Sequence, residues 1–385
     1  MQINILPRQY LVSMRLFLSF ILLTFFLISG VSAQTAVNSA YRERARAITA
    51  SLDDSSLAAQ VLLTGIEGRQ ALSPAMRNIL RRIPAGGIML FRYNLDTTKN
   101  DIRNLLSEAS ALITGRNGIA PYIAVDHEGG LVHRFGTLAE RPPSAYSFWE
   151  LAQVSGLEAA LLDAETIYRR SAMEIRELGI NMVLGPVVEI LNSENRAFLD
   201  TRSYGPDVEF TQAAASAYVR AMNAAGIASV LKHFPGNTGV DPHHGSSVLN
   251  ADRAALNELA EPFAGIIREL SPPAVMVSHV MVPALDSRAN ASLSRPVIEG
   301  WLREELGFQG IVIADDLAMG AVVSRDAIVE ALLAGVDMIM VWPQSITSAH
   351  NAILNALQNG RLPRIRLEQA AERIIAEKLR YGLVP

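Results

Sequence analysis

The sequence predicts an α/β protein built as a single (β/α)8 barrel of the TIM type. Short apolar stretches rich in β-branched residues alternate along the chain with longer amphipathic stretches, which is the pattern of repeated strand–helix units. Eight such apolar stretches are present, the number of strands in a TIM barrel. The chain has 385 residues, of which 50% are hydrophobic and 19% charged, so it can bury a large core and is not disordered or fibrous in composition.

The predicted strands and helices follow one another in order along the chain. Strands are expected at Gln60–Thr64, Gly87–Phe91, Tyr122–Val125, Asn181–Leu184, Ala228–Leu231, Ala274–Val277, Ile311–Ala314 and Asp337–Val341. Helices are expected between them, among others at Leu157–Leu178, Val208–Ala225, Ala251–Leu270 and Arg295–Leu306. A doubly wound open sheet is the alternative fold, but the first strand is not followed by the Gly-x-Gly-x-x-Gly turn of a dinucleotide site.

The first 33 residues have the features of a secretory signal peptide. Arg8 and Arg15 precede the apolar run Leu16–Val31, and Val31 and Ala33 suit cleavage after Ala33. We predict a signal peptide over residues 1–33 and one domain over residues 34–385 of an exported protein, periplasmic or extracellular. The apolar run is short for a membrane span, so no span is expected after cleavage, and an uncleaved N-terminal anchor is the alternative.

Composition excludes several classes of protein. The chain has no cysteine, which excludes disulfides, a thiol nucleophile and cysteine-ligated metals. The net charge is −4, and −6 without the two arginines of the signal segment, whereas a nucleic-acid-binding protein needs a basic surface. The three lysines are Lys99, Lys232 and Lys378, so a lysine at the end of a strand stands out.

Polar residues follow several of the predicted strands. Asp126 follows the third strand, Lys232 and His233 the fifth, Ser278-His279 the sixth, and Asp315-Asp316 the seventh. An aspartate at such a position often caps a helix, and a single histidine is often structural. In a barrel, however, the carboxyl ends of the strands meet at one opening, so together these residues predict a functional cleft. A lysine at a strand end is costly to bury unless it is paired, and a carboxylate of the site is its expected partner.

The loop after the fifth strand carries acid–base groups between glycines. Residues 235–245 read P-G-N-T-G-V-D-P-H-H-G, as expected of a mobile loop at an active site. Asp241 and His243 lie two residues apart, so the carboxylate can hold the imidazole in one tautomer and raise its pKa. A solvated polar loop is the alternative interpretation.

Four segments of the chain are similar to sequence motifs of one known family of proteins. Residues 126–135, D-H-E-G-G-L-V-H-R-F, are similar to the motif D-Q-E-G-G-R-V-Q-R-F, and residues 202–205, R-S-Y-G, to R-S-F-G. Residues 232–236 match K-H-F-P-G, and residues 313–319, I-A-D-D-L-A-M, are similar to V-x-S-D-D-L-x-M. With these motifs the chain resembles glycoside hydrolase family 3, in particular its single-domain bacterial β-N-acetylglucosaminidases of peptidoglycan turnover. The resemblance extends from about Gln60 to the C-terminus and implies that residues 34–385 form the N-terminal-type catalytic barrel of this family.

The resemblance implies a role for each matching residue. Asp315 matches the catalytic nucleophile of a retaining glycosidase, His243 its acid/base and Asp241 the partner of that histidine. The sugar-binding positions are matched by Asp126, Arg134, Arg202, Lys232 and His233. The loop that carries Asp241 is about two residues shorter than the family pattern, so His244 is a second candidate for the acid/base. Leu131 and Ala314 replace the arginine and serine usual in the family, which changes the pocket without removing a catalytic group.

The implied protein is an exported enzyme that removes terminal β-linked N-acetylglucosamine from muropeptides or chito-oligosaccharides, without a cofactor or a metal. One alternative is a β-glucosidase or β-xylosidase of the same family, although such enzymes usually have a second domain and only about 44 residues follow the eighth strand. Another is a metal-dependent barrel hydrolase using His233, His243, His279 and Asp315, although its usual His-x-His is replaced by Gly65-Ile66-Glu67. A non-catalytic exported sugar-binding protein is the third.

Overall fold

The computed structural model of the chain describes residues 39–322, 324 and 326–385. The predicted signal peptide and its cleavage site lie outside these residues. No helix in the described part of the chain combines the length and the apolar character that crossing a membrane requires.

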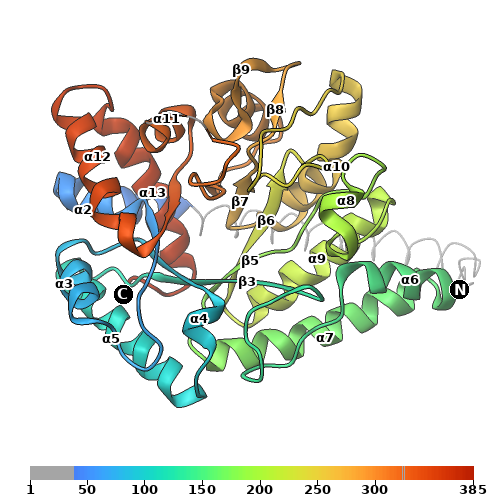
Figure 1. The fold of residues 1–385 in the computed structure, drawn as a ribbon, viewed down its shortest axis with the longest axis horizontal. Helices are drawn as coiled ribbons and strands as arrows, with labels where there is room; N and C mark the ends of the chain where they lie inside the picture. The colour runs from blue at the N-terminus through green and yellow to red at the C-terminus, as the bar shows by residue number, and fades with distance from the viewer. Residues whose placement is uncertain (1–38, 323, 325) are drawn as a thin grey trace, which may run out of the picture.

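Eight parallel strands within the described residues close into a barrel, so the predicted fold is confirmed (Figure 1). Neighbouring strands pair in the order β2-β1-β11-β10-β7-β6-β5-β3, and β3 returns to pair with β2 through Gly87–Tyr122 and Leu90–Val125. Their bounds are β1 Leu62–Gly65, β2 Gly87–Leu90, β3 Tyr122–Gly129, β5 Met182–Leu184, β6 Ala228–Phe234, β7 Ala274–Val277, β10 Ile311–Ala314 and β11 Met338–Val341. Three short strands lie outside the barrel: β4 Val132–His133, β8 Met281–Val282 and β9 Asp286–Asn290.

The eight expected strands are all present; three differ from their expected bounds by more than one residue, and the others agree to within one residue. β1 begins at Leu62 rather than Gln60, because Gln60 is the last residue of helix α2. β3 runs on to Gly129, since its end forms an antiparallel pair with β4. β6 runs on to Phe234, where it pairs with Val277 of β7. Polar residues expected just after these two strands therefore lie within them, on a hydrogen-bonded scaffold.

Helices surround the barrel and connect its strands (Figure 1). Their bounds are α2 Asp54–Gln60, α3 Pro74–Arg82, α4 Arg92–Leu95, α5 Lys99–Asn117, α6 Ala145–Ser155, α7 Leu157–Glu177, α8 Arg196–Leu199, α9 Val208–Ala224, α10 Arg253–Leu270, α11 Ala327–Ala334, α12 Ile346–Gln358 and α13 Arg364–Arg380, after a helix at 39–51. Single 3-10 turns are η1 Asp200–Arg202, η2 Ala291–Leu293 and η4 Pro343–Ser345. The helix expected at Arg295–Leu306 is a π-helix, η3 Pro296–Glu305, in which the N–H of Leu306 reaches the carbonyl of Trp301.

Aspartates that cap helices are distinct from those expected in the cleft. The side chain of Asp207 accepts a hydrogen bond from the N–H of Phe210 at the start of α9, and that of Asp252 accepts one from Ala255 at the start of α10. These bonds satisfy N–H groups that the first turn of a helix leaves free. Capping thus accounts for Asp207 and Asp252, but not for Asp126, which lies within β3.

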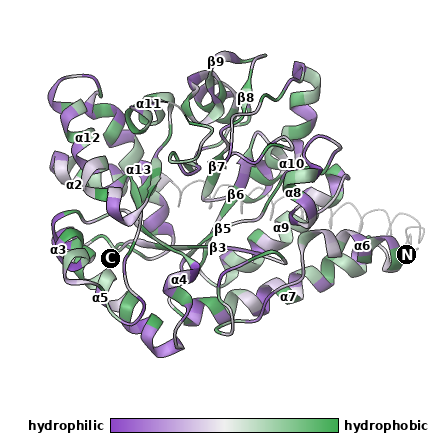
Figure 2. Ribbon diagram, viewed as in Figure 1, coloured by the Kyte–Doolittle hydropathy of each residue, from purple (hydrophilic) through white to green (hydrophobic). Residues whose placement is uncertain are grey.

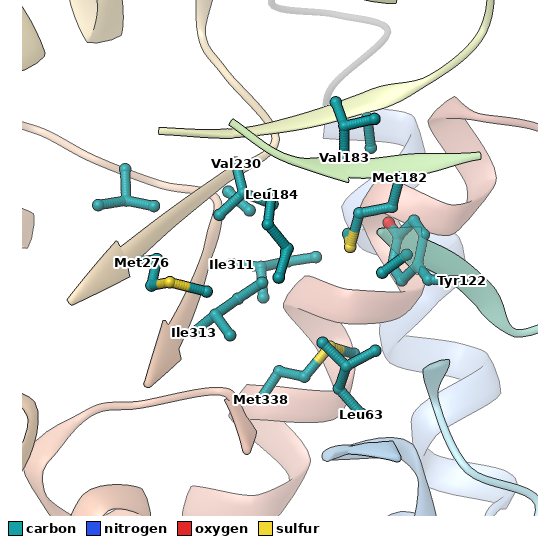
Figure 3. Close-up of a cluster of buried hydrophobic side chains, with 14 of the residues drawn as sticks. Leu63, Tyr122, Met182, Val183, Leu184, Val230, Met276, Ile311, Ile313 and Met338 are labelled. Carbon is teal, nitrogen blue, oxygen red and sulfur yellow. The ribbon is translucent and has the colours of Figure 1, made fainter. Parts of the chain in front are cut away.

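The core fills the barrel and the layer between strands and helices. Figure 2 shows hydrophobic residues concentrated on the central strands, while the surrounding helices alternate between hydrophobic and hydrophilic residues. Figure 3 shows side chains from strands around the barrel gathered in one cluster, and four of these, Leu63, Met182, Ile313 and Met338, are fully buried. Full burial of each such side chain contributes about 1.5–3 kcal/mol relative to exposure. This packed interior fixes the strand ends that carry the polar residues.

Candidate active site

One cavity of about 980 Å³ opens at the carboxyl ends of the barrel strands. The eight residues expected in the site all line it: Asp126, Arg134, Arg202, Lys232, His233, Asp241, His243 and Asp315. They come from β3, β6 and the loops that follow β3, β5, β6 and β10. The convergence expected from the barrel topology is therefore present in the structure.

The alternation of side chains along β3 separates cavity residues from core residues. Asp126 and Glu128 line the cavity, whereas His127 between them is buried on the other side, with Nε2 2.7 Å from the hydroxyl of Ser171 in α7. Burial, reinforced by the nearby His133, lowers the pKa of His127 to about 3. His127 is thus a neutral core residue at neutral pH, although it lies in the motif that carries Asp126.

A network of ion pairs forms one wall of the cavity. Lys232 Nζ lies 3.0 Å from Oδ1 of Asp126 and 2.7 Å from Oε1 of Glu128. Arg202 donates two hydrogen bonds to Glu128, from Nε at 2.8 Å and from a terminal nitrogen at 2.9 Å. Arg134 lies 3.3 Å from Asp126. Lys232 was expected to pair with one carboxylate of the site, and it pairs with two. The second, Glu128, was missing from the predicted site.

The network keeps its members charged despite their burial. Burial alone would lower the pKa of Lys232, but Asp126 and Glu128 raise it above its usual value. Burial would likewise raise the pKa of Glu128, but Lys232 and Arg202 hold it far below its usual range. Lys232 and Arg134 lower the pKa of Asp126 in the same way. The wall therefore presents fixed charges of both signs, which suit the donors and acceptors of sugar hydroxyls.

Glu189, in the loop after β5, holds His233 and was also missing from the sequence prediction. Its Oε1 lies 2.6 Å from Nδ1 of His233, and its Oε2 accepts the N–H of Asn237 at 2.6 Å. Gly236 permits this approach, since its φ of 138° is rarely adopted by other residues. The signal that could have revealed Glu189 is a single carboxylate inside the apolar run Val187–Leu191.

The loop after β6 brings Asp241 and His243 together. Oδ1 of Asp241 lies 2.7 Å from Nδ1 of His243 and accepts the N–H of the same residue at 2.9 Å. Burial would raise the pKa of Asp241, but these two hydrogen bonds lower it. The ring of His244 lies 4.0 Å from Asp241, and its side chain is 84% exposed. The geometry therefore favours His243 over His244 as the partner of Asp241.

Asp315 and Asp316 follow β10 and have different surroundings. Asp315 is 8% exposed, and its Oδ1 accepts the N–H of Asp316 at 2.9 Å. Oδ2 of Asp316 accepts a hydrogen bond from the indole N–H of Trp342, and its Oδ1 accepts the N–H of Ala318. His279 does not line the cavity, but its Nε2 lies 3.0 Å from the carbonyl oxygen of Asp316, so it contacts the backbone of this loop.

Metal ligation was one of the alternatives considered for this site. Across residues 39–322, 324 and 326–385, no group of three or more histidine, cysteine, aspartate or glutamate side chains is arranged to hold a metal ion. The alternative set of His233, His243, His279 and Asp315 is thus not assembled around one point.

Comparison with known proteins identifies relatives over most of the chain. Residues 57–376 match the family described as glycosyl hydrolase family 3 N terminal domain. A protein of Methylococcus capsulatus named beta-hexosaminidase is 36% identical over 298 residues, which cover 75% of this chain and 84% of that protein. A beta-hexosaminidase of Xanthomonas oryzae is 34% identical over 312 residues, which cover 78% of this chain and 88% of that protein.

The fold is also similar to that of solved structures. A glycoside hydrolase family 3 beta-N-acetylglucosaminidase from a Paenibacillus species superposes with a TM-score of 0.81 at 30% sequence identity. The superposition covers 86% of this chain and 63% of the Paenibacillus chain, so this chain corresponds to a part of that protein.

Proposed function

The chain belongs to glycosyl hydrolase family 3 and is a glycoside hydrolase of the beta-hexosaminidase type, and on this premise we propose that it is a retaining exo-β-N-acetylglucosaminidase. The observation that carries the proposal is the position of Asp315 and the Asp241–His243 pair in the wall of one cavity. A retaining glycosidase needs an ionised nucleophile and a separate group that first donates and then accepts a proton.

In the first step, a carboxylate oxygen of Asp315 attacks the anomeric carbon while the bond to the leaving oxygen breaks. His243 donates its Nε2 proton to that oxygen, because Nδ1 is held by Asp241. In the second step, neutral His243 takes a proton from water, the water oxygen bonds to the anomeric carbon, and the bond to Asp315 breaks. The ionised Asp241 stabilises the imidazolium form of His243 when it carries both protons.

The ion-pair wall is proposed to bind the sugar on the non-reducing side of the broken bond. Asp126 and Glu128 provide acceptors, and Lys232, Arg134 and Arg202 provide donors, all held in place by one another. His233 adds a ring nitrogen, since its Nδ1 is held by Glu189 and its Nε2 is left for a hydroxyl or the acetamido group. The wall is thus organised before the substrate arrives, which limits the cost of binding.

N-acetylglucosaminyl muropeptides or chito-oligosaccharides are the proposed substrates. Support comes from the names of the relatives and from the predicted signal peptide, which would export the enzyme to the compartment of the cell wall. Export is tested by mass spectrometry of the N-terminus of the mature protein. A chain that begins at Gln34 supports it, whereas a membrane-bound chain that retains Met1 supports the anchor.

Hydrolysis of an aryl β-N-acetylglucosaminide beside the matching aryl β-glucoside tests the proposed activity. We expect turnover of the first to exceed that of the second, with the β-anomer of N-acetylglucosamine as the first product detected by NMR. Faster turnover of the glucoside would favour the other glycosidases of the family. Loss of activity on treatment with a chelator would favour the metal-dependent hydrolase, and binding without turnover would favour the sugar-binding protein.

A further inference from the structure

Three aromatic rings line one side of the cavity beside residues of the proposed mechanism. Phe91 follows β2, Tyr93 lies in α4, and Trp342 follows β11. The centroids of the Phe91 and Trp342 rings lie 4.6 Å apart with the rings inclined by 6°, and those of Phe91 and Tyr93 lie 5.8 Å apart with an inclination of 14°. We call these three residues the aromatic strip.

Two rings of the strip are more exposed than the buried members of the ion-pair wall, Glu128 and Lys232. Trp342 is 36% and Tyr93 39% exposed, whereas Glu128 is 6% exposed. Because Phe91 covers one face of the Trp342 indole, the exposed surface of that ring belongs to its other face and its edge. The proposed chemistry uses none of this apolar surface.

One loop connects the strip to the reacting groups. Residues 315–321 begin with Asp315, and Asp316 accepts the indole N–H of Trp342 at 2.8 Å. Farther along the same loop, the N–H of Ala321 donates to the carbonyl of Pro242, next to His243. The nucleophile, the proposed proton donor and Trp342 are therefore arranged around a single short segment.

We propose that the aromatic strip binds the leaving-group sugar, with the pyranose ring stacked on the face of Trp342 that Phe91 leaves open. The broader face of a β-linked pyranose carries C–H bonds and is apolar, so it suits an aromatic ring, while the hydroxyls at its edge remain in water. The sugar to be released occupies the deeper ion-pair wall, and the next sugar extends from the leaving oxygen beside His243 toward the opening. This inference rests on the proposed function.

Two substrates with the same N-acetylglucosaminyl group test the subsite. Chitobiose places a sugar ring on the leaving side, whereas N-acetyl-β-glucosaminyl azide places only a small azido group there, which departs as azide ion. We expect Trp342→Ala to lower kcat/KM for chitobiose about tenfold more than for the azide. Trp342→Phe is the matched control, because it also removes the hydrogen bond to Asp316 but keeps an aromatic ring. It should therefore keep most of the kcat/KM for chitobiose, relative to the azide, that Trp342→Ala loses.

A binding measurement separates the subsite from the activity. In the Asp315→Asn protein, we expect Trp342→Ala to lower the affinity for chitobiose about tenfold and the affinity for the monosaccharide N-acetylglucosamine much less. Equal losses for both substrates or both ligands, or no loss for either, would overturn the subsite. If the wild-type enzyme hydrolyses neither substrate, the proposed function fails, and the subsite then fails too unless chitobiose still binds through Trp342.

Discussion

Glu189 Oε1 and Nδ1 of His233 lie 2.6 Å apart, with 1% and 7% of the two side chains exposed. Since Glu189 also accepts the N–H of Asn237, one carboxylate holds both the ring of His233 and the start of the loop that carries Asp241 and His243. Glu189 is therefore a positioning residue, which acts on the substrate only through its neighbours.

We predict that Glu189→Gln lowers kcat/KM for an aryl β-N-acetylglucosaminide by about 10–100-fold, by analogy with carboxylates that orient metal-binding histidines. An amide can still accept one hydrogen bond, but it lacks the charge that fixes the tautomer of His233. Glu194→Gln is the matched control, since Glu194 is exposed in the same loop region. Steady-state kinetics and the affinity for N-acetylglucosamine check this, and a change in thermal stability alone, with unchanged kinetics and affinity, would refute the positioning role.

The barrel could be predicted from the sequence because its strands are short apolar runs that alternate with amphipathic helical stretches. The ends of β3 and β6 could not be predicted. Polar residues such as Asp126 and Lys232 belong to these strands only because the strand ends pair with other segments. Pairing of this kind depends on residues far apart in the chain, and no local pattern reveals it.

The same limit applies to the site. Residues at strand ends were found because barrel topology alone brings them together. Glu189 was not found, because it reaches the site only when its loop folds back on β6, where the N–H of Val188 donates to the carbonyl of Lys232 at 2.7 Å. The pairing of Glu128 with Arg202, 74 residues away, is equally invisible in the sequence.

We predict that Asp315→Ala lowers turnover by about 1,000-fold or more with little change in far-UV circular dichroism, because no other group in the same geometry can form the covalent intermediate. Asp316→Asn is the control and should retain far more activity, since the amide oxygen can still accept the Trp342 N–H. A fluorinated sugar substrate that traps the intermediate should leave an ester on Asp315, detectable by peptide mass spectrometry. An ester on Asp316 would shift the assignment by one residue.

We predict that His243→Ala slows hydrolysis of substrates with poor leaving groups far more than that of activated aryl glycosides, whose leaving oxygen needs no proton. A plot of log kcat/KM against the pKa of the leaving group should therefore become steeper in the variant. A constant loss across the series would show that His243 is not the general acid.

The neighbours of His243 give a matched pair of variants. Asp241→Asn should reproduce much of the defect, because it removes the charge that lies 2.7 Å from the ring. His244→Ala should have less than about a threefold effect on kcat/KM, since it leaves that pair intact. If the severity of these two variants is reversed, the acid/base is His244.

At the opposite end of the barrel, Lys378 of α13 is fully buried. Its Nζ lies 3.0 Å from Oε1 of Gln60 and 5.5 Å from the centre of the ring of Tyr122, the first residue of β3. Burial lowers the pKa of Lys378 to about 7, from 10.5 for a free side chain. Above pH 10.5 the lysine is neutral in the folded and the unfolded protein and costs nothing in charge burial. As the pH falls from 10.5 to 7, the unfolded protein binds a proton that the folded protein does not, so the free energy of unfolding decreases.

We therefore predict that Lys378→Met stabilises the protein at pH 7 relative to wild type and that this advantage shrinks as the pH rises toward 10. The electrostatic cost removed is about 3–5 kcal/mol at pH 7, offset by about 1–3 kcal/mol because Gln60 loses its hydrogen-bond donor. Burial also raises the pKa of Glu377 to about 7, but this carboxyl titrates in both proteins, so its contribution cancels in the difference. Urea unfolding of both proteins at pH 7, 8.5 and 10 measures the effect, with the exposed Lys99→Met as a control that should show no such slope. A difference between Lys378→Met and wild type that stays constant across this range would mean that Lys378 is already protonated in the folded protein.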